Sequence, residues 1–145
     1  MNFEPKDPNF SEKIYKSFSG QTVMNLIGAN LIKVEAGQID IKLPFRSELT
    51  QQNGFIHAGI ITTIADSACG YAAFSLMPEN SNVLSVEFKV NLLSPAIGDY
   101  FVAEGRIIKA GRTLGVARGD VFAVKDKETK RVAAMLATMM CLANT

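Results

Sequence analysis

The chain has 145 residues, of which 48% are hydrophobic, and its 15 basic residues nearly balance 14 acidic ones for a net charge of +1. This length and composition are typical of one globular domain, which we expect to span residues 1–145 around a single core. The balanced charge argues against a nucleic-acid partner, and the N-terminus lacks the basic-then-apolar pattern of a signal peptide, so we expect a cytoplasmic protein.

The first third of the chain predicts a helix and then a hairpin. Apolar residues recur every four positions between residues 10 and 18, which indicates a short amphipathic helix. The segments 31–35 and 38–43 flank the pair Ala36-Gly37, and the second segment alternates apolar and polar residues. We therefore expect two antiparallel strands joined by a tight turn.

The segment 58–77 is apolar on nearly every side and is closed by Pro78, which predicts a long buried helix. A membrane span is excluded, because the central Asp66 alone would cost about 2.5 to 3.5 kcal/mol on insertion scales. Small residues fill the second half of the segment, so other backbone can approach closely. Gly70 costs about 1 kcal/mol relative to alanine in a helix, and we interpret it as a place where a strand packs.

The remainder of the chain predicts four strands, at 84–92, 100–108, 114–124 and 132–142. In the first of these, Leu84, Val86 and Phe88 alternate with polar residues that include Ser85, so we expect one apolar face to be buried. The strands are longer than average, which allows the sheet to curl. Together the elements predict an α+β fold in which a curved antiparallel sheet wraps around a long central helix.

Asp66 is the only charged residue of the segment 58–77. Burying an unpaired carboxylate costs several kcal/mol, which favours chemistry or ligand binding at Asp66 over a role as acceptor for a neighbouring donor. The helix start at His57-Ala58-Gly59 offers exposed backbone N–H groups at the favourable end of the helix dipole. A carbonyl oxygen that gains negative charge during attack on its carbon needs such donors.

The stretch from Asn53 through His57-Ala58-Gly59 to Asp66, nine positions after the histidine, resembles the His-Gly-Gly…Asp segment of hotdog-fold acyl-CoA thioesterases, in particular the phenylacetate-pathway type. The run 83–88 and the turn Ser94-Pro95-Ala96 are similar to the next strand and turn of that family. The resemblance extends from about residue 31 to residue 142. It implies a hotdog fold and hydrolysis of acyl-CoA.

The resemblance also implies individual roles. Asp66 matches the catalytic carboxylate, which acts as a general base on water or as a nucleophile. Ala58, where the family usually has the first glycine, matches the backbone donor to the thioester carbonyl, and Gly59 adjoins it. His57 matches the residue that shapes the turn, with direct proton transfer as the alternative. Ser85 matches a hydroxyl near the carboxylate.

The substrate contacts are expected from several segments. Gln51 stands where the family often has an amide, with the neighbouring Gln52 and Asn53 as alternatives. Arg112 is a candidate contact for the phosphates of coenzyme A. An apolar acyl tunnel would be lined by Phe55, Ile60, Ile61, Tyr71 and Phe74. Cys69 and Cys141 belong to no metal-binding pattern, so we interpret both as reduced core residues and expect no metal and no cofactor beyond the coenzyme A of the substrate.

The spacing of the two catalytic groups predicts an oligomer. Asp66 lies eight residues after Ala58, which is about 12 Å along a helix that rises about 1.5 Å per residue. One carbonyl cannot contact both groups, so we expect a homodimer in which each site takes Asp66 from one subunit and the turn from the other. Two dimers would form a homotetramer. The alternative functions are a hotdog dehydratase or hydratase and a non-catalytic acyl-CoA binding protein.

Overall fold

The structure is a computed structural model that describes residues 2–144. Its elements, in chain order, are α1 (Phe10–Gly20), α2 (Thr22–Ile27), β1 (Asn30–Glu35), β2 (Gln38–Pro44), the 3-10 helix η1 (Ser47–Leu49), α3 (Ala58–Phe74), β3 (Ser81–Leu92), β4 (Tyr100–Ala110), β5 (Leu114–Lys125) and β6 (Glu128–Ala143). None of the helices within residues 2–144 has the length and apolar character that crossing a membrane requires.

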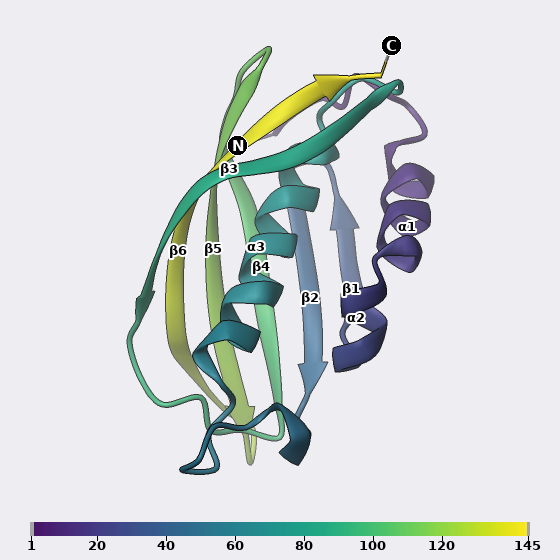
Figure 1. The fold of residues 1–145 in the computed structure, drawn as a ribbon. Helices are drawn as coiled ribbons and strands as arrows, with labels where there is room; N and C mark the ends of the chain where they lie inside the picture. The colour runs from purple at the N-terminus through teal and green to yellow at the C-terminus, as the bar shows by residue number, and fades with distance from the viewer. Residues whose placement is uncertain (1, 145) are drawn as a thin grey trace.

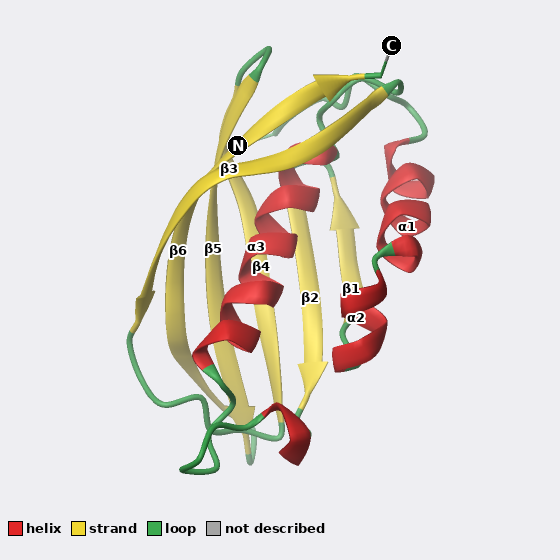
Figure 2. Cartoon of the chain, in the orientation of Figure 1, coloured by secondary structure: helices red, strands yellow, loops and turns green. Residues whose placement is uncertain are grey.

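The strands form one six-stranded antiparallel sheet in the order β1-β2-β4-β5-β6-β3. The sheet curves around α3, while α1 and α2 lie beside β1 (Figure 1). Colouring by secondary structure separates this helical layer from the sheet behind it (Figure 2). The predicted hotdog fold is therefore confirmed. The short helix α2 was not predicted, because its 6 residues are too few to show a helical period.

Close packing of α3 on the sheet depends on two glycines that face each other across β4 and β5. Gly105 is paired with Gly119. A Cβ on Gly105 would overlap the carbonyl group of Ala68, and a Cβ on Gly119 would lie 2.7 Å from the sulfur of Cys69. The expectation that a strand packs against Gly70 is wrong, since a Cβ there would have no neighbour within 4 Å. The close approach is provided by glycines of the sheet.

Replacing Gly105 with alanine is expected to lower the free energy of unfolding by about 3 kcal/mol or more, because the added methyl group must displace the backbone of α3. Thermal and denaturant unfolding measure the effect. Gly115→Ala in β5 is the matched control, since its Cβ would lie 3.4 Å from the nearest atom, which is an ordinary contact. Equal stabilities of the two variants would contradict this account of the packing.

An irregularity in β3 changes which side chains face the core. The pairing of β3 with β6 shifts between Ser85 and Glu87, as at a β-bulge. Ser85 is paired with the buried Met139 and Phe88 with the buried Ala137, so both face inward. Leu84 faces outward. Leu84 and Phe88 therefore do not share one buried face, as was predicted together with Val86. The side chains of Leu84, Val86 and Phe88 are 55%, 51% and 42% exposed.

Candidate active site

The start of α3 presents one open backbone donor. His57 is the N-cap residue, and its Nδ1 accepts a hydrogen bond of 2.8 Å from the N–H of Gly59. The Nδ1 atom is therefore unprotonated. The N–H of Ala58 has no acceptor among residues 2–144. Of the two expected donors, Ala58 is available to a ligand and Gly59 is held by the cap.

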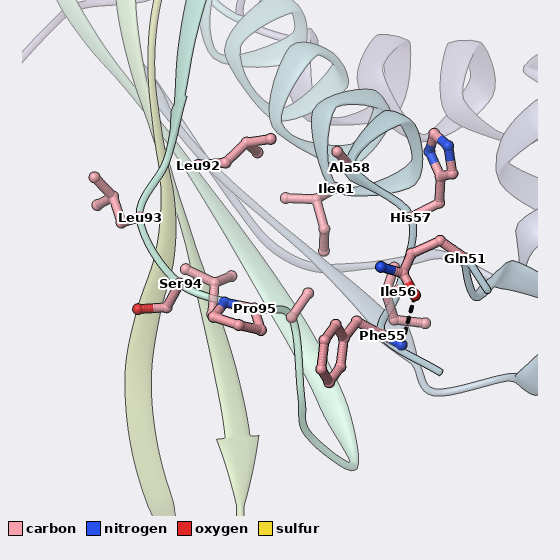
Figure 3. Close-up of a pocket in the computed structure, with 12 residues that line it drawn as sticks. Gln51, Phe55, Ile56, His57, Ala58, Ile61, Leu92, Leu93, Ser94 and Pro95 are labelled. Atoms are coloured by element: carbon pink, nitrogen blue, oxygen red, sulfur yellow. Dashed lines mark hydrogen bonds between the residues drawn. The ribbon is translucent and has the colours of Figure 1, made fainter. Parts of the chain in front are cut away.

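The loop before α3 is held together by Gln51. The backbone N–H of Gln51 donates to the carbonyl of Phe55 at 2.8 Å, and its side-chain oxygen accepts hydrogen bonds from the N–H groups of Asn53 and Phe55. The amide nitrogen of Gln51 remains on the cavity side of the loop (Figure 3). Asn53 is exposed. Gln51 lines the apolar cavity described below, whereas Asn53 lines neither of the two cavities.

An apolar cavity of about 420 Å³ lies beside Ala58. Phe55, Ile61 and Leu92 project into it from the loop, from α3 and from the end of β3 (Figure 3). Its complete lining is Gln51, Phe55, Ile56, His57, Ala58, Ile61, Leu92, Leu93, Ser94, Pro95, Ala96 and Val132. The open N–H of Ala58 therefore adjoins a space that suits an apolar group.

Asp66 lies half-buried on α3 and contacts β3. Its Oδ1 accepts a hydrogen bond of 2.6 Å from the hydroxyl of Ser85, which also lies 3.4 Å from the sulfur of Met139. No cationic side chain in the part of the chain that the structure describes forms an ion pair with Asp66. The serine fixes one carboxylate oxygen, and the other oxygen is available for chemistry.

A second, polar cavity of about 340 Å³ adjoins Asp66. Its lining is Ser17, Gly20, Gln21, Asp66, Ser67, Gly70, Tyr71, Val83 and Ser85. The first three of these belong to α1 and its C-terminal end, which form one wall. The sequence analysis missed this wall, although the spacing of residues 17, 20 and 21 would place them on one helix face.

Asp66 and Ala58 line different cavities, and the two cavities share no residue. A single chain therefore does not bring the carboxylate to the open N–H group. The expected acyl tunnel is also divided, because Phe55 and Ile61 line the apolar cavity whereas Tyr71 lines the polar one. Ile60 and Phe74 line neither.

Two further sequence-predicted residues lie apart from these cavities. Arg112 is exposed in the turn between β4 and β5. Cys69 is fully buried, and desolvation, followed by the charges of Asp66 and Asp120, raises the pKa of its thiol to about 12. Its thiol is protonated and unreactive near neutral pH, as expected for a core residue.

The six-stranded sheet wrapped around α3 defines a hotdog domain (Figure 1). Residues 53–130 match the family described as the Thioesterase superfamily. The chain belongs to this family, which supports hydrolysis of an acyl thioester in general.

Solved structures of related chains agree with this assignment. A thioesterase family protein from Silicibacter pomeroyi is 47% identical, with a TM-score of 0.92 over 93% of this chain and 99% of that one. The E. coli PaaI protein from the phenylacetic acid degradation operon has a TM-score of 0.83 at 17% identity, over 94% and 96% of the two chains. A thioesterase from Haemophilus influenzae has a TM-score of 0.80 at 18% identity, over 89% and 88%. The last two show a shared fold.

Proposed function

We propose that the protein hydrolyses an acyl-CoA thioester to the free acid and coenzyme A at two composite sites of a homodimer. The observation that carries the proposal is the division of one catalytic apparatus between two cavities. Asp66 has a free carboxylate oxygen in the polar cavity, and Ala58 has an open N–H group beside the apolar cavity. An antiparallel partner would bring one group of each kind to the same carbonyl.

The proposed reaction follows from these two groups. Asp66 removes a proton from water as the water oxygen bonds to the carbonyl carbon, and Ala58 of the partner subunit donates its N–H to the resulting oxyanion. The C–S bond then breaks, and the thiolate of coenzyme A takes the proton from Asp66. In the alternative route, Asp66 itself bonds to the carbon and expels the thiolate, and water hydrolyses the mixed anhydride that results.

The edge strand β3 supports the dimer. It ends the sheet with no further strand beside it, and Phe88 and Leu92 on its inner face are 42% and 54% exposed. An uncovered apolar edge invites association. A second copy of β3 would cover this edge and extend the sheet. On the outer face, Leu84, Leu114 and Leu136 are 55%, 46% and 51% exposed, which supports further association of dimers into a tetramer.

Thiol release from a panel of short, medium, long and aromatic acyl-CoA compounds tests the proposed function. We expect hydrolysis of at least one compound, and light scattering should give the mass of a dimer or tetramer. Binding without release of thiol would favour the acyl-CoA binding protein. Hydration or dehydration of the acyl chain without thiol release would favour the hydratase class.

We expect hydrolysis to require no metal or cofactor. Asp66 is the only carboxylate that lines either cavity, and the Nδ1 of His57 already accepts a hydrogen bond, so these linings offer no set of metal ligands. The protein should keep its full rate after prolonged dialysis against EDTA. A loss of rate that zinc or manganese restores would contradict the proposed mechanism.

A further inference from the structure

We propose that the polar cavity beside Asp66 receives the acyl group, and that Gly70, Tyr71 and Ser17 make it selective for short acyl groups that carry a hydroxyl. This inference rests on the proposed hydrolysis and adds a substrate class to it. Three features carry the inference: the cavity, the buried glycine that leaves space in it, and a pair of hydroxyl groups in its wall.

The first observation is the space at Gly70. This buried residue lies four positions after Asp66 and therefore on the same face of α3. A Cβ at Gly70 would have no neighbour within 4 Å, although alanine would favour the helix. Gly20 of α1 lines the same cavity at its exposed rim. The buried Gly70 thus leaves room for a ligand next to the carboxylate.

The second observation is the hydroxyl pair. The oxygen atoms of Ser17 and Tyr71 lie 3.3 Å apart, near the long end of the hydrogen-bond range. Burial raises the pKa of Tyr71 above its ordinary value, and this outweighs the opposite effect of its hydrogen bond to Ser17, so the hydroxyl keeps its proton. Either oxygen can accept a further hydrogen bond from a ligand hydroxyl. In the same lining, the side-chain amide of Gln21 and the hydroxyl of Ser67 are hydrogen-bonded to each other.

The oxygen atoms of Ser17 and Tyr71 share one hydrogen bond, and an apolar acyl group would leave their further hydrogen-bonding capacity unused. A hydroxyl on the acyl group would use it. Asp66 and Tyr71 line the same cavity of about 340 Å³. A hydroxyl at the end of a short acyl chain whose carbonyl lies at Asp66 would therefore be within reach of Tyr71.

The lining also indicates that the acyl group, and not the coenzyme A arm, enters the polar cavity. Asp66 is the only charged residue among those that line the polar cavity, and its negative charge opposes the phosphates of coenzyme A. A volume of about 340 Å³ suits a small acyl group. The apolar cavity is bordered by the exposed residues Leu93 and Pro95, so the arm that continues to the nucleotide can leave through it.

The first test compares 6-hydroxyhexanoyl-CoA with hexanoyl-CoA, which differ only in the terminal hydroxyl. We expect kcat/KM to favour the hydroxylated compound by about 10-fold or more, because a site built for a hydroxyl discriminates against its absence. Tyr71→Phe keeps the ring that packs 5.8 Å from Phe18 and should reduce the ratio to near one. Ser17→Ala should lower the ratio in the same direction.

The second test uses Gly70→Ala, which places a methyl group in the cavity. We expect kcat/KM to fall by about 10-fold for branched and aromatic acyl groups and much less for acetyl-CoA, because the loss of space matters most to large groups. Thermal stability should be equal or higher. Gly115→Ala, which lines neither cavity, should leave the acyl profile unchanged.

Hydrolysis without a preference for the hydroxylated compound, or a preference that survives Tyr71→Phe, would overturn this assignment of the cavity. Dissociation of the oligomer by Gly70→Ala with an unchanged acyl profile would also overturn it, since the partner subunit would then fill the space. No thiol release from any compound would refute the proposed hydrolysis itself.

Discussion

Replacing Asp66 with asparagine is expected to lower kcat by roughly 10³-fold, because the change removes the base or nucleophile at nearly constant volume. The amide oxygen can still accept the hydrogen bond that Ser85 donates to Oδ1. The variant should therefore fold and bind acyl-CoA as the wild type does. The rate of thiol release measures kcat. Circular dichroism checks that the variant is folded, and calorimetry measures its affinity for acyl-CoA.

Ser85→Ala is the companion variant. It leaves the carboxylate in place but removes its one hydrogen bond from a side chain, so we expect a loss of kcat of roughly 10-fold, smaller than that of Asp66→Asn. If Asp66→Asn retained about half of the wild-type rate, the proposed mechanism would fail. Equal losses in the two variants would show that Ser85 does more than orient the carboxylate.

Local periodicity predicted the order and type of most elements. The alternation in 38–43 and the apolar run from residue 58 are strong signals because each spans several turns or pleats. The central helix begins at Ala58 as predicted and ends at Phe74, three residues before the expected end. The turn at Gly37 was predictable too, since its φ of 76° suits glycine best.

Contacts between distant segments could not be predicted from local patterns. Regular alternation in β3 would turn Ser85 and Phe88 to opposite faces, and only the irregularity between Ser85 and Glu87 turns both inward. Ser85 meets Asp66 for that reason. The glycines that allow α3 to pack closely on the sheet lie on strands far along the chain. One wall of the polar cavity comes from α1. None of these contacts leaves a signal in a short window of sequence.

The sequence predicts which residues are candidates for the site but not which of their groups are open to a ligand. A lone carboxylate in an apolar helix points to Asp66, and a histidine at the helix start points to the turn His57-Ala58-Gly59. Which N–H group is open depends on the orientation of one side chain, because the Nδ1 of His57 occupies the N–H of Gly59 and leaves that of Ala58. A side-chain orientation of this kind is set by the folded loop.

Ala58→Pro should remove the open donor with little cost to the fold. Ala58 is the first residue of α3, a position where proline is favoured and where its missing N–H breaks no helical hydrogen bond. His57 has φ −59° and ψ 138°, which suit a residue before proline. We expect kcat to fall by roughly 10²- to 10³-fold, as for the loss of an oxyanion donor. Thiol release measures the loss, and circular dichroism and thermal unfolding check the fold.

The shared site is tested by combining the two variants in one dimer. A dimer of one Asp66→Asn subunit and one Ala58→Pro subunit, purified through two different tags, contains one intact composite site and one site with both defects. We expect it to recover roughly half of the wild-type rate, whereas each parent homodimer stays inactive. The matched control places both substitutions in one subunit beside a wild-type subunit, so that each composite site carries one defect. This control should be inactive if the site is shared, and half-active if each chain carries its own complete site. No recovery in the first heterodimer, or full activity in a monomer, would contradict the composite site.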